Sequence, residues 1–507
     1  MSHANQQATG LMRLAARSKA ADRLEATTHV AATASHELNT DLCVIGGGSG
    51  GLSVAAAAAQ LGVSVVLIEK HKMGGDCLNY GCVPSKALIA AGRRAHVMRS
   101  SAPFGVAPVS PRVDHSAVRD HIHDVIAAIA PNDSVERFVG LGVTVIQAAG
   151  HFATRNTVQA GDYRIKARRF VIAAGSSPAI PPIPGLERVP YFTNETIFDN
   201  REQLDHLIVV GAGPIGLELA QAYQRLGSRV TVIEADRALR KDDPELSEVV
   251  LRRLRGEGIE IREGAMIERV SGNGRSIDVQ VSQGGEQATL QGTHLLLATG
   301  RTPNTADLNL EAAAIKYDKH GIKVNSALKT SNRRVFAIGD IAGGPQFTHI
   351  ANYHAGIVIR RVVFRLSAKV DNSTLAWATF TDPELAHVGL TEEEARARHG
   401  KINVYRWPYH ENDRAQAERA TDGLVKVVTD ANGKIRGAGV VGEQAGELIQ
   451  MWSLAVSQGL SIKAMAQWIS PYPTLSEINK RAAFGYYATA AAKPLVRKVI
   501  GWLRKFG

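Results

Sequence analysis

The strongest constraint on the fold is a unit of sequence that occurs twice. An apolar run, a glycine-rich turn, a helix-forming stretch and a second apolar run follow one another, and a glutamate ends the unit. In the first copy the apolar run 41–45 leads into the turn 46–51, and the run 63–68 ends at Glu69. In the second copy the run 206–210 leads into the turn 211–216, and the run 229–233 ends at Glu234. Each copy is typical of a buried parallel strand, a helix and a second parallel strand.

The glycines recur at the same places in the two turns, and the first glycine lies 23 positions before the glutamate in both copies, 46 to 69 and 211 to 234. In a dinucleotide-binding unit the first glycine makes the turn and the second lets the backbone approach a pyrophosphate. The third permits close helix–strand packing, and the acid accepts ribose hydroxyls. We therefore predict two Rossmann-like dinucleotide-binding domains, with FAD and NAD(H) as the usual ligands. The glycines are Gly46, Gly48 and Gly51 in the first copy and Gly211, Gly213 and Gly216 in the second.

A pair of cysteines, Cys77 and Cys82, is the second chemical feature of the sequence. Only one other cysteine, Cys43, is present in the 507 residues. We expect the pair on the first turns of a helix, whose N-terminus stabilises thiolates. Two buried cysteines or half a zinc site are the alternatives, but nearby residues supply no further zinc ligands. The spacing favours a redox-active disulfide and no metal site, with electrons passing from nicotinamide to flavin to disulfide.

The remaining motifs divide the chain into domains. A strand and turn at 170–178 recur at 295–304, with Gly175 and Gly300 in the turns, and the strand 335–340 ends in Asp340. Short alternating runs after residue 370 are typical of antiparallel strands, accompanied by helices. We expect a first, FAD-binding domain over 41–185 and 300–369, and an NAD(P)-binding domain over 186–299. An α+β dimerisation domain over 370–487, a flexible extension over 1–40 and a basic amphipathic tail over 488–507 complete the prediction.

Charge and composition narrow the class of protein. The net charge is +11, but the last twenty residues hold five basic side chains and no acid, so the body is modestly basic and nucleic-acid binding is disfavoured. Three cysteines and the absence of a signal-peptide pattern predict a cytoplasmic protein. The apolar positions of residues 493–507 recur at helical spacing. This tail is expected to dock on the body of the protein or to contact a membrane peripherally.

From residue 41 to about 485 the chain resembles the pyridine nucleotide–disulfide oxidoreductases of class I, the group of dihydrolipoyl dehydrogenase, glutathione reductase and mercuric reductase. The resemblance rests on the order of the two glycine fingerprints, the cysteine pair and the motifs at 298–301, 338–340 and 473–477. It implies a homodimer in which the C-terminal domain of one subunit completes the active site of the other.

The resemblance also implies roles for individual residues. Cys82 is expected beside the flavin as a thiolate, Cys77 as the thiol that meets the substrate, and Lys86 by the flavin N5 with Glu218 as its partner. Plain helix-surface positions for Lys86 and Glu218 are the alternative. Further FAD-binding residues are expected at Glu69, Gly175 and Asp340, and further NAD-binding residues at Glu234 and Gly300.

One position departs from the family pattern. The catalytic histidine expected before the Pro-Thr of the C-terminal motif is replaced by Tyr472, although Glu477 is retained. A phenol titrates near pH ~10 and an imidazole near ~6.5, so tyrosine is a poor base at neutrality. The expected substrate is a disulfide or dithiol, as in dihydrolipoyl dehydrogenase. A metal-ion or quinone acceptor, in the manner of mercuric reductase, is the alternative, although no cysteine follows Cys82. A flavin-binding redox sensor is the non-enzymatic alternative.

The second fingerprint bears on the choice of nucleotide. Glu234 is placed to accept ribose hydroxyls and to repel a 2′-phosphate, which favours NADH. Arg237 and Arg240 follow closely, so NADP(H) is the alternative.

Overall fold

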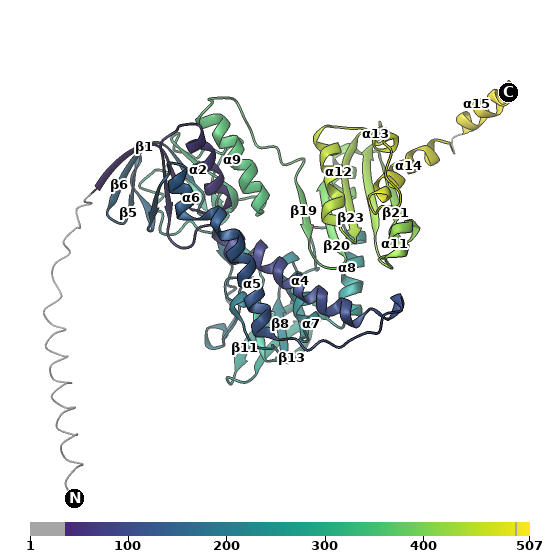
Figure 1. Cartoon of the computed structure of the whole chain (residues 1–507), viewed down its shortest axis with the longest axis horizontal. Coiled ribbons are helices and arrows are strands. Elements are labelled where there is room, and N and C mark those ends of the chain that lie inside the picture. The colour runs from purple at the N-terminus through teal and green to yellow at the C-terminus, as the bar shows by residue number, and fades with distance from the viewer. Residues whose placement is uncertain (1–35, 492–493, 507) are drawn as a thin grey trace, which may run out of the picture.

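The computed structural model describes residues 36–491 and 494–506. Their elements form three lobes, each built on its own sheets and called a layer below, that lie next to one another (Figure 1). The first layer is a mixed sheet of order β3-β2-β1-β6-β5-β4, with β18 paired to β6. The buried segments of its parallel strands, such as Leu42–Ile45 of β1 and Phe170–Ile172 of β6, are apolar, because helices and loops cover both faces there. The strands are β1 (His36–Ile45), β2 (Val65–Glu69), β3 (Thr144–Gln147), β4 (Gly150–Thr154), β5 (Thr157–Ala160), β6 (Tyr163–Ile172) and β18 (Val335–Ala337).

Two helices pack together on the first sheet. The alanine-rich α2 (Ser49–Gln60) lies against α9 (Thr348–Val362), two segments almost 300 residues apart in the chain. The short side chains of α2 allow this close approach, and Ala55 and Ala58 are fully buried. Sequence reasoning placed the start of ordered structure at residue 41, but β1 begins at His36 and pairs with β6 from there. The predicted extension over 1–40 is therefore wrong for 36–40, and residues 1–35 lie outside the described residues.

The second layer is a parallel sheet of order β10-β9-β8-β14 beside an antiparallel sheet of order β11-β12-β13. The helices α4 (Cys82–Arg99) and α5 (His115–Ile129) come early in the chain, yet Leu88 and Ile122 share a core with the second fingerprint helix, α7 (Pro214–Arg225). The other elements are β8 (His206–Val210), β9 (Arg229–Glu234), α8 (Pro244–Gly256), β10 (Glu260–Glu263), β11 (Ala265–Gly272), β12 (Ile277–Gln283), β13 (Glu286–Gly292) and β14 (His294–Leu297).

The third layer is an antiparallel sheet of order β19-β20-β23-β22-β21. Helices pack on it around the fully buried Trp452, whose indole N–H donates to the side chain of Asn479 over 2.8 Å. The elements are β19 (Ala376–Thr379), β20 (Glu384–Gly389), α10 (Glu392–His399), β21 (Ile402–Pro408), α11 (Asp413–Ala417), β22 (Leu424–Asp430), β23 (Ile435–Gly442), α12 (Ala445–Ser457), α13 (Ile462–Gln467) and α14 (Glu477–Ala491). The predicted fold class, two dinucleotide-binding layers and a C-terminal α+β layer, is confirmed.

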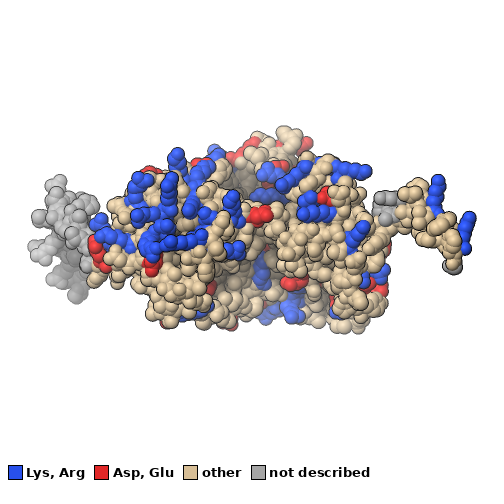
Figure 2. Space-filling model, turned by 90° about the horizontal axis from the view of Figure 1, so that it is seen from above, with Lys and Arg blue, Asp and Glu red and all other residues tan. Residues whose placement is uncertain are grey.

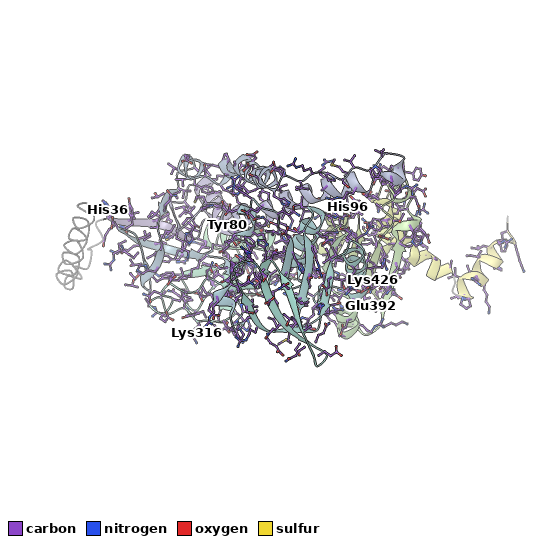
Figure 3. All side chains as sticks on the ribbon, turned by 90° about the horizontal axis from the view of Figure 1, so that it is seen from below. His36, Tyr80, His96, Lys316, Glu392 and Lys426 are labelled. Atoms are coloured by element: carbon purple, nitrogen blue, oxygen red, sulfur yellow. The ribbon has the colours of Figure 1, made fainter. Side chains whose placement is uncertain are left out.

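A buried cation joins the second layer to the third. Lys426 on β22 is only 5% exposed, and its ammonium lies 2.8 Å from the carboxylates of Asp243 and Glu245 and 3.0 Å from Glu392. Lys426 and Glu392 are labelled side by side in Figure 3. The acids at the start of α8 are thus tied to the third sheet, so the two layers are held in one relative position.

The C-terminal tail extends away from the body (Figure 1). Its helix α15 (Pro494–Leu503) has no buried residue. The prediction that the tail docks on the body of its own chain is therefore wrong for the described residues 494–506. Among the described residues, no helix combines the length and apolar character needed to cross a membrane.

Candidate active site

A cleft of about 3200 Å³ opens where the three layers meet. The cysteine pair, Lys86 and Glu218 line it together with residues from both fingerprints. Tyr80, between the two cysteines, is labelled near the middle of the molecule in Figure 3. Of the residues predicted from sequence, the cleft is lined by Gly46, Gly48, Glu69, Cys77, Cys82, Lys86, Gly175, Gly211, Gly213, Glu218, Glu234, Gly300 and Asp340.

The two glycine turns have the same local geometry. Gly46 and Gly211 have φ angles of 110° and 105°, which side chains rarely adopt. A Cβ on Gly51 would lie 1.9 Å from the carbonyl oxygen of Gly46, and one on Gly216 would lie 2.0 Å from that of Gly211. The first and third glycines of each turn are thus required for the helix to approach the strand.

The middle glycine of each turn faces open space. A Cβ on Gly213 would meet no atom within 4 Å, and one on Gly48 would meet only the Cα of Gly75, at 3.8 Å. Space at this position, next to the free N–H groups of a helix N-terminus, is what a pyrophosphate needs. Both turns therefore fit a dinucleotide.

The glutamate at the end of each second strand closes its turn. One oxygen of Glu69 accepts from the N–H of Gly47 over 2.6 Å, and one oxygen of Glu234 accepts from the N–H of Ala212 over 2.8 Å. The second oxygen in each case accepts from an N–H two residues further along the chain. Each carboxylate is therefore fixed beside its glycine turn, where the ribose of a dinucleotide would lie.

The cysteines lie on two helices, not on the single helix expected. Cys77 belongs to the short α3 (Gly75–Asn79), and Cys82 is the first residue of α4. The break falls at Gly81, where a Cβ would lie 2.8 Å from a carboxylate oxygen of Asp76. Two helices therefore carry the two thiols, and both cysteines line the cleft.

The pKa values of the two thiols are shifted in opposite directions. The pKa of Cys82 is lowered to about 6, chiefly by a hydrogen bond from Cys77 and with smaller contributions from Thr348 and Lys86. The same hydrogen bond is the largest cause that raises the pKa of Cys77, and burial adds to it. The hydroxyl of Thr348, at the start of α9, lies 3.4 Å from the sulfur of Cys82. Cys82 is therefore the thiolate of the pair at neutral pH, and Cys77 keeps the proton.

Lys86 lies one turn after Cys82 on α4 and meets two other layers. Its ammonium is 2.8 Å from a carboxylate oxygen of Glu218 on α7 and 4.3 Å from the centre of the Phe380 ring. The other oxygen of Glu218 accepts from the N–H of Phe380 over 2.9 Å. The lysine is therefore held by an ion pair and a cation–π contact together. Sequence reasoning missed Phe380, because nothing along the chain indicates that residue 380 returns to α4.

A second network, also missed, links the cysteine loop to Asp340. The guanidinium of Arg301 lies 3.0 Å from Asp76, donates to Ser176 over 2.7 Å and lies 3.8 Å from Asp340. Burial raises the pKa of Asp340, while the hydroxyl of Ser176, 2.5 Å away, and Arg301 oppose that rise. The signal for Arg301 was its position directly after Gly300, at the end of the second fingerprint domain.

Tyr472 and Glu477 lie outside the cleft in this chain. Tyr472 is 69% exposed, and its hydroxyl donates to Asp413 over 2.9 Å. This contact raises the pKa of the phenol. Glu477 pairs instead with Arg481, 3.0 Å away and one turn further along α14. The two residues predicted to act together are therefore engaged by different partners, and Asp413 is the carboxylate that sequence reasoning missed.

Comparison with known proteins places the chain among its relatives. Residues 40–355 match the family model described as pyridine nucleotide-disulphide oxidoreductase, and residues 375–483 match the dimerisation domain of the same family. The chain belongs to the pyridine nucleotide–disulphide oxidoreductases. It is therefore an oxidoreductase of a family that depends on FAD and uses NAD(P)H.

The relatives in this family carry several activities. A mercuric reductase from Lysinibacillus sphaericus is 36% identical over 89% of this chain and 83% of its own. A dihydrolipoyl dehydrogenase from Bacillus subtilis is 34% identical over 88% of this chain and 96% of its own. A copper(II) complex of the HOCl-induced flavoprotein disulfide reductase RclA from Escherichia coli covers 88% of this chain and 99% of its own, with a TM-score of 0.79 and 26% identity.

Proposed function

We propose that this protein is an FAD-dependent NADH oxidoreductase that passes electrons through Cys77 and Cys82 to a disulfide acceptor. The observation that carries the proposal is the polarised pair in the cleft, a thiolate at Cys82 and a protonated thiol at Cys77, with Lys86 one turn away. In this proposal Cys82 receives electrons from the bound flavin, and Cys77 passes them to the substrate.

The first fingerprint and the residues around it fit FAD. Gly46, Gly48 and Glu69 would receive its adenosine and pyrophosphate, and Gly175 and Asp340 would contact the rest of the chain of the cofactor. When bound, FAD takes a hydride from nicotinamide and delivers an electron pair to a disulfide. Lys86 supplies a fixed positive charge at the N-terminal end of α4, which faces the cleft. Such a charge stabilises the negative charge that a flavin gains on reduction.

The second fingerprint supports NADH over NADPH. Glu234 is held at the ribose position, and the nearby cations are already engaged: Arg237 donates to the backbone carbonyls of Arg240 and Asp242, and Arg240 pairs with Asp236. We expect NADH to give a kcat/KM at least tenfold above that with NADPH. Equal values for the two nucleotides would contradict this assignment.

The dithiol chemistry balances as two exchanges. The sulfur of Cys77, on losing its proton, attacks the acceptor disulfide, forms a mixed disulfide and releases one thiolate. The thiolate of Cys82 then attacks the sulfur of Cys77, restores the Cys77–Cys82 disulfide and releases the second thiolate. The acceptor gains two electrons and, from solvent or a protein acid, two protons.

A second subunit is part of this proposal. The C-terminal region matches a dimerisation domain, and it exposes Ile469, three residues before Tyr472, and Phe484 on α14. We infer a homodimer in which Tyr472 and Glu477 of one subunit face the Cys77 of its partner. Ile469→Arg is expected to give monomers by light scattering and to abolish acceptor reduction. A monomeric wild-type protein with full activity would refute the inferred dimer.

Tyr472 favours a second candidate acceptor, a thiophilic metal ion such as mercuric ion. Two thiolates bind such an ion directly and need no general base, and the relatives include mercuric reductases. No cysteine follows Cys82 in the sequence, so Cys77 and Cys82 would have to bind the ion without help from a C-terminal cysteine pair.

A panel of acceptors separates the candidates. NADH oxidation is measured with glutathione disulfide, lipoamide, mercuric and cupric ions and quinones, in wild type and in Cys77→Ala. Turnover of a disulfide that Cys77→Ala abolishes supports the first candidate, and turnover of a metal ion alone supports the second. Quinone turnover that survives Cys77→Ala shows that the dithiol is bypassed, and no turnover with any acceptor leaves a flavin-binding sensor. A long-wavelength thiolate–flavin band on NADH titration is expected, and its absence with FAD bound would overturn both reductase candidates.

A further inference from the structure

The C-terminal helix α15 is a surface of the molecule that the redox function does not use. It follows the third layer and projects away from the body of the molecule (Figure 1). Leu495, Trp502 and Phe506 are 73%, 59% and 71% exposed, so large apolar side chains face solvent along its whole length. Isolated exposed apolar residues are common on protein surfaces, but a continuous stripe of them marks a binding surface.

The side chains of this helix are sorted by polarity. When the spacing of α15, about 100° per residue, is continued to residue 506, the apolar side chains fall on one arc of about 160°, and the basic ones fall on the rest of the circle. No acidic residue occurs between 494 and 506. Figure 2 shows the basic side chains on this projecting helix with no acid beside them. The apolar residues are Leu495, Val496, Val499, Ile500, Trp502, Leu503 and Phe506, and the basic residues are Arg497, Lys498, Arg504 and Lys505.

The arrangement fits a lipid surface better than a groove on a protein. On the same helical projection, Arg504 lies beside Ile500 at one edge of the apolar arc, and Lys498 lies beside Trp502 at the other. Long basic side chains at both edges place their charges among phosphate headgroups while the apolar arc enters the acyl region. Tryptophan also prefers this boundary. The ten residues of α15 are too few to cross a bilayer, which needs about 20.

We propose that α15 binds the surface of anionic membranes, lying in the plane of the headgroups, and so brings the redox domains to the membrane. The attraction has two parts: burial of the apolar arc, and the four positive charges facing anionic lipid. Each basic side chain near an anionic surface contributes about fivefold to the partition constant. Loss of all four is therefore expected to reduce binding by two orders of magnitude or more.

Vesicle sedimentation with the full-length, FAD-loaded protein tests the proposal. The protein is expected to bind phosphatidylcholine vesicles that contain phosphatidylglycerol, and this binding is expected to weaken as salt is added. No binding is expected with phosphatidylcholine alone. Deletion of residues 494–506 and the combined variant Arg497→Gln, Lys498→Gln, Arg504→Gln, Lys505→Gln are expected to abolish binding. A matched control removes the same charge from exposed positions of the body, Lys316→Gln, Lys319→Gln, Arg333→Gln and Lys401→Gln, and is expected to bind as wild type.

Trp502 reports the depth of insertion. Its fluorescence is expected to shift to the blue on binding and to be quenched by brominated acyl chains, and Trp502→Phe is expected to bind but lose both changes. Wild-type protein that ignores anionic vesicles, or a tail deletion that binds them as well as wild type, would overturn the proposal. A deletion that alters the oligomeric state and not lipid binding would assign α15 to a second copy of the chain instead. The tail deletion is expected to leave NADH oxidation unchanged, because residues 494–506 do not line the cleft.

Discussion

Replacement of Cys77 by alanine removes the hydrogen-bond donor that contributes most to the low pKa of Cys82. With the pKa at about 6, roughly nine-tenths of Cys82 is thiolate at pH 7. A hydrogen bond to a charged group is worth about 1.5–3 kcal/mol, and a pKa unit corresponds to about 1.4 kcal/mol. The Cys77→Ala variant is therefore expected to titrate about one to two units higher, with about a half to a tenth of Cys82 ionised at pH 7.

The assay is the rate of alkylation of Cys82 by iodoacetamide as a function of pH, in reduced protein, with the modified residue identified by mass spectrometry. Thiolates react and thiols do not, so the midpoint of the rate profile is the pKa. Cys43 does not interfere, because it is fully buried and burial raises its pKa.

Cys77→Ser is the matched control, because its hydroxyl keeps a donor next to Cys82. It is expected to titrate close to wild type. If Cys77→Ala keeps the wild-type midpoint, or if Cys77→Ser moves as far as Cys77→Ala, the hydrogen bond is not what holds the thiolate. A wild-type midpoint near 8.5, the ordinary value for cysteine, would refute the assignment of Cys82 as the thiolate and Cys77 as the protonated thiol.

Three further predictions follow from contacts elsewhere in the molecule. Gly51→Ala is expected to lose bound FAD, read from flavin absorbance after gel filtration, because its Cβ would overlap the carbonyl of Gly46; retention of FAD would count against the close approach. Lys426→Ala is expected to destabilise the fold by about 3–5 kcal/mol in chemical denaturation, because it leaves the buried Asp243 unpaired, whereas loss of the exposed Arg240 is expected to cost less than about 1 kcal/mol. Phe380→Leu is expected to weaken reduction by NADH several-fold in stopped-flow measurements, because it removes the ring under Lys86; Phe380→Tyr, which keeps a ring, should be close to wild type.

The repeated units show how far local sequence reaches. Glycine spacing and a terminal glutamate are local properties of a strand–turn–helix, so the two turns, the paired layers and the strands on either side of them could be predicted from the sequence. The pairing of β18 with β6 could be expected in the same way, because a buried apolar strand satisfies its backbone hydrogen bonds only in a sheet.

What sequence could not supply depends on contacts across layers. Phe380 reaches Lys86 from almost 300 residues away, and Asp413 meets Tyr472 from 59 residues away. The sequence also does not predict the break between α3 and α4. The carboxylate of Asp76 lies there where a side chain on Gly81 would be, and this contact cannot be read from the spacing of the cysteines. The tail was misjudged for a related reason: amphipathic spacing shows that a helix has an apolar face, but not what covers it.

The proton positions at the two ends of the dithiol bear on the direction of the reaction. Cys82 is the thiolate and Cys77 holds the proton, so the electron pair that arrives at Cys82 and the proton needed by the product are on neighbouring sulfurs. Tyr472, with its hydroxyl donating to Asp413 and its pKa raised, is protonated at neutral pH. A protonated phenol gives a proton to a departing thiolate, whereas oxidation of a dithiol requires a group that takes one. In the proposed homodimer, where Tyr472 of one subunit faces Cys77 of the other, these proton positions favour reduction of an acceptor by NADH over oxidation of a dithiol by NAD⁺.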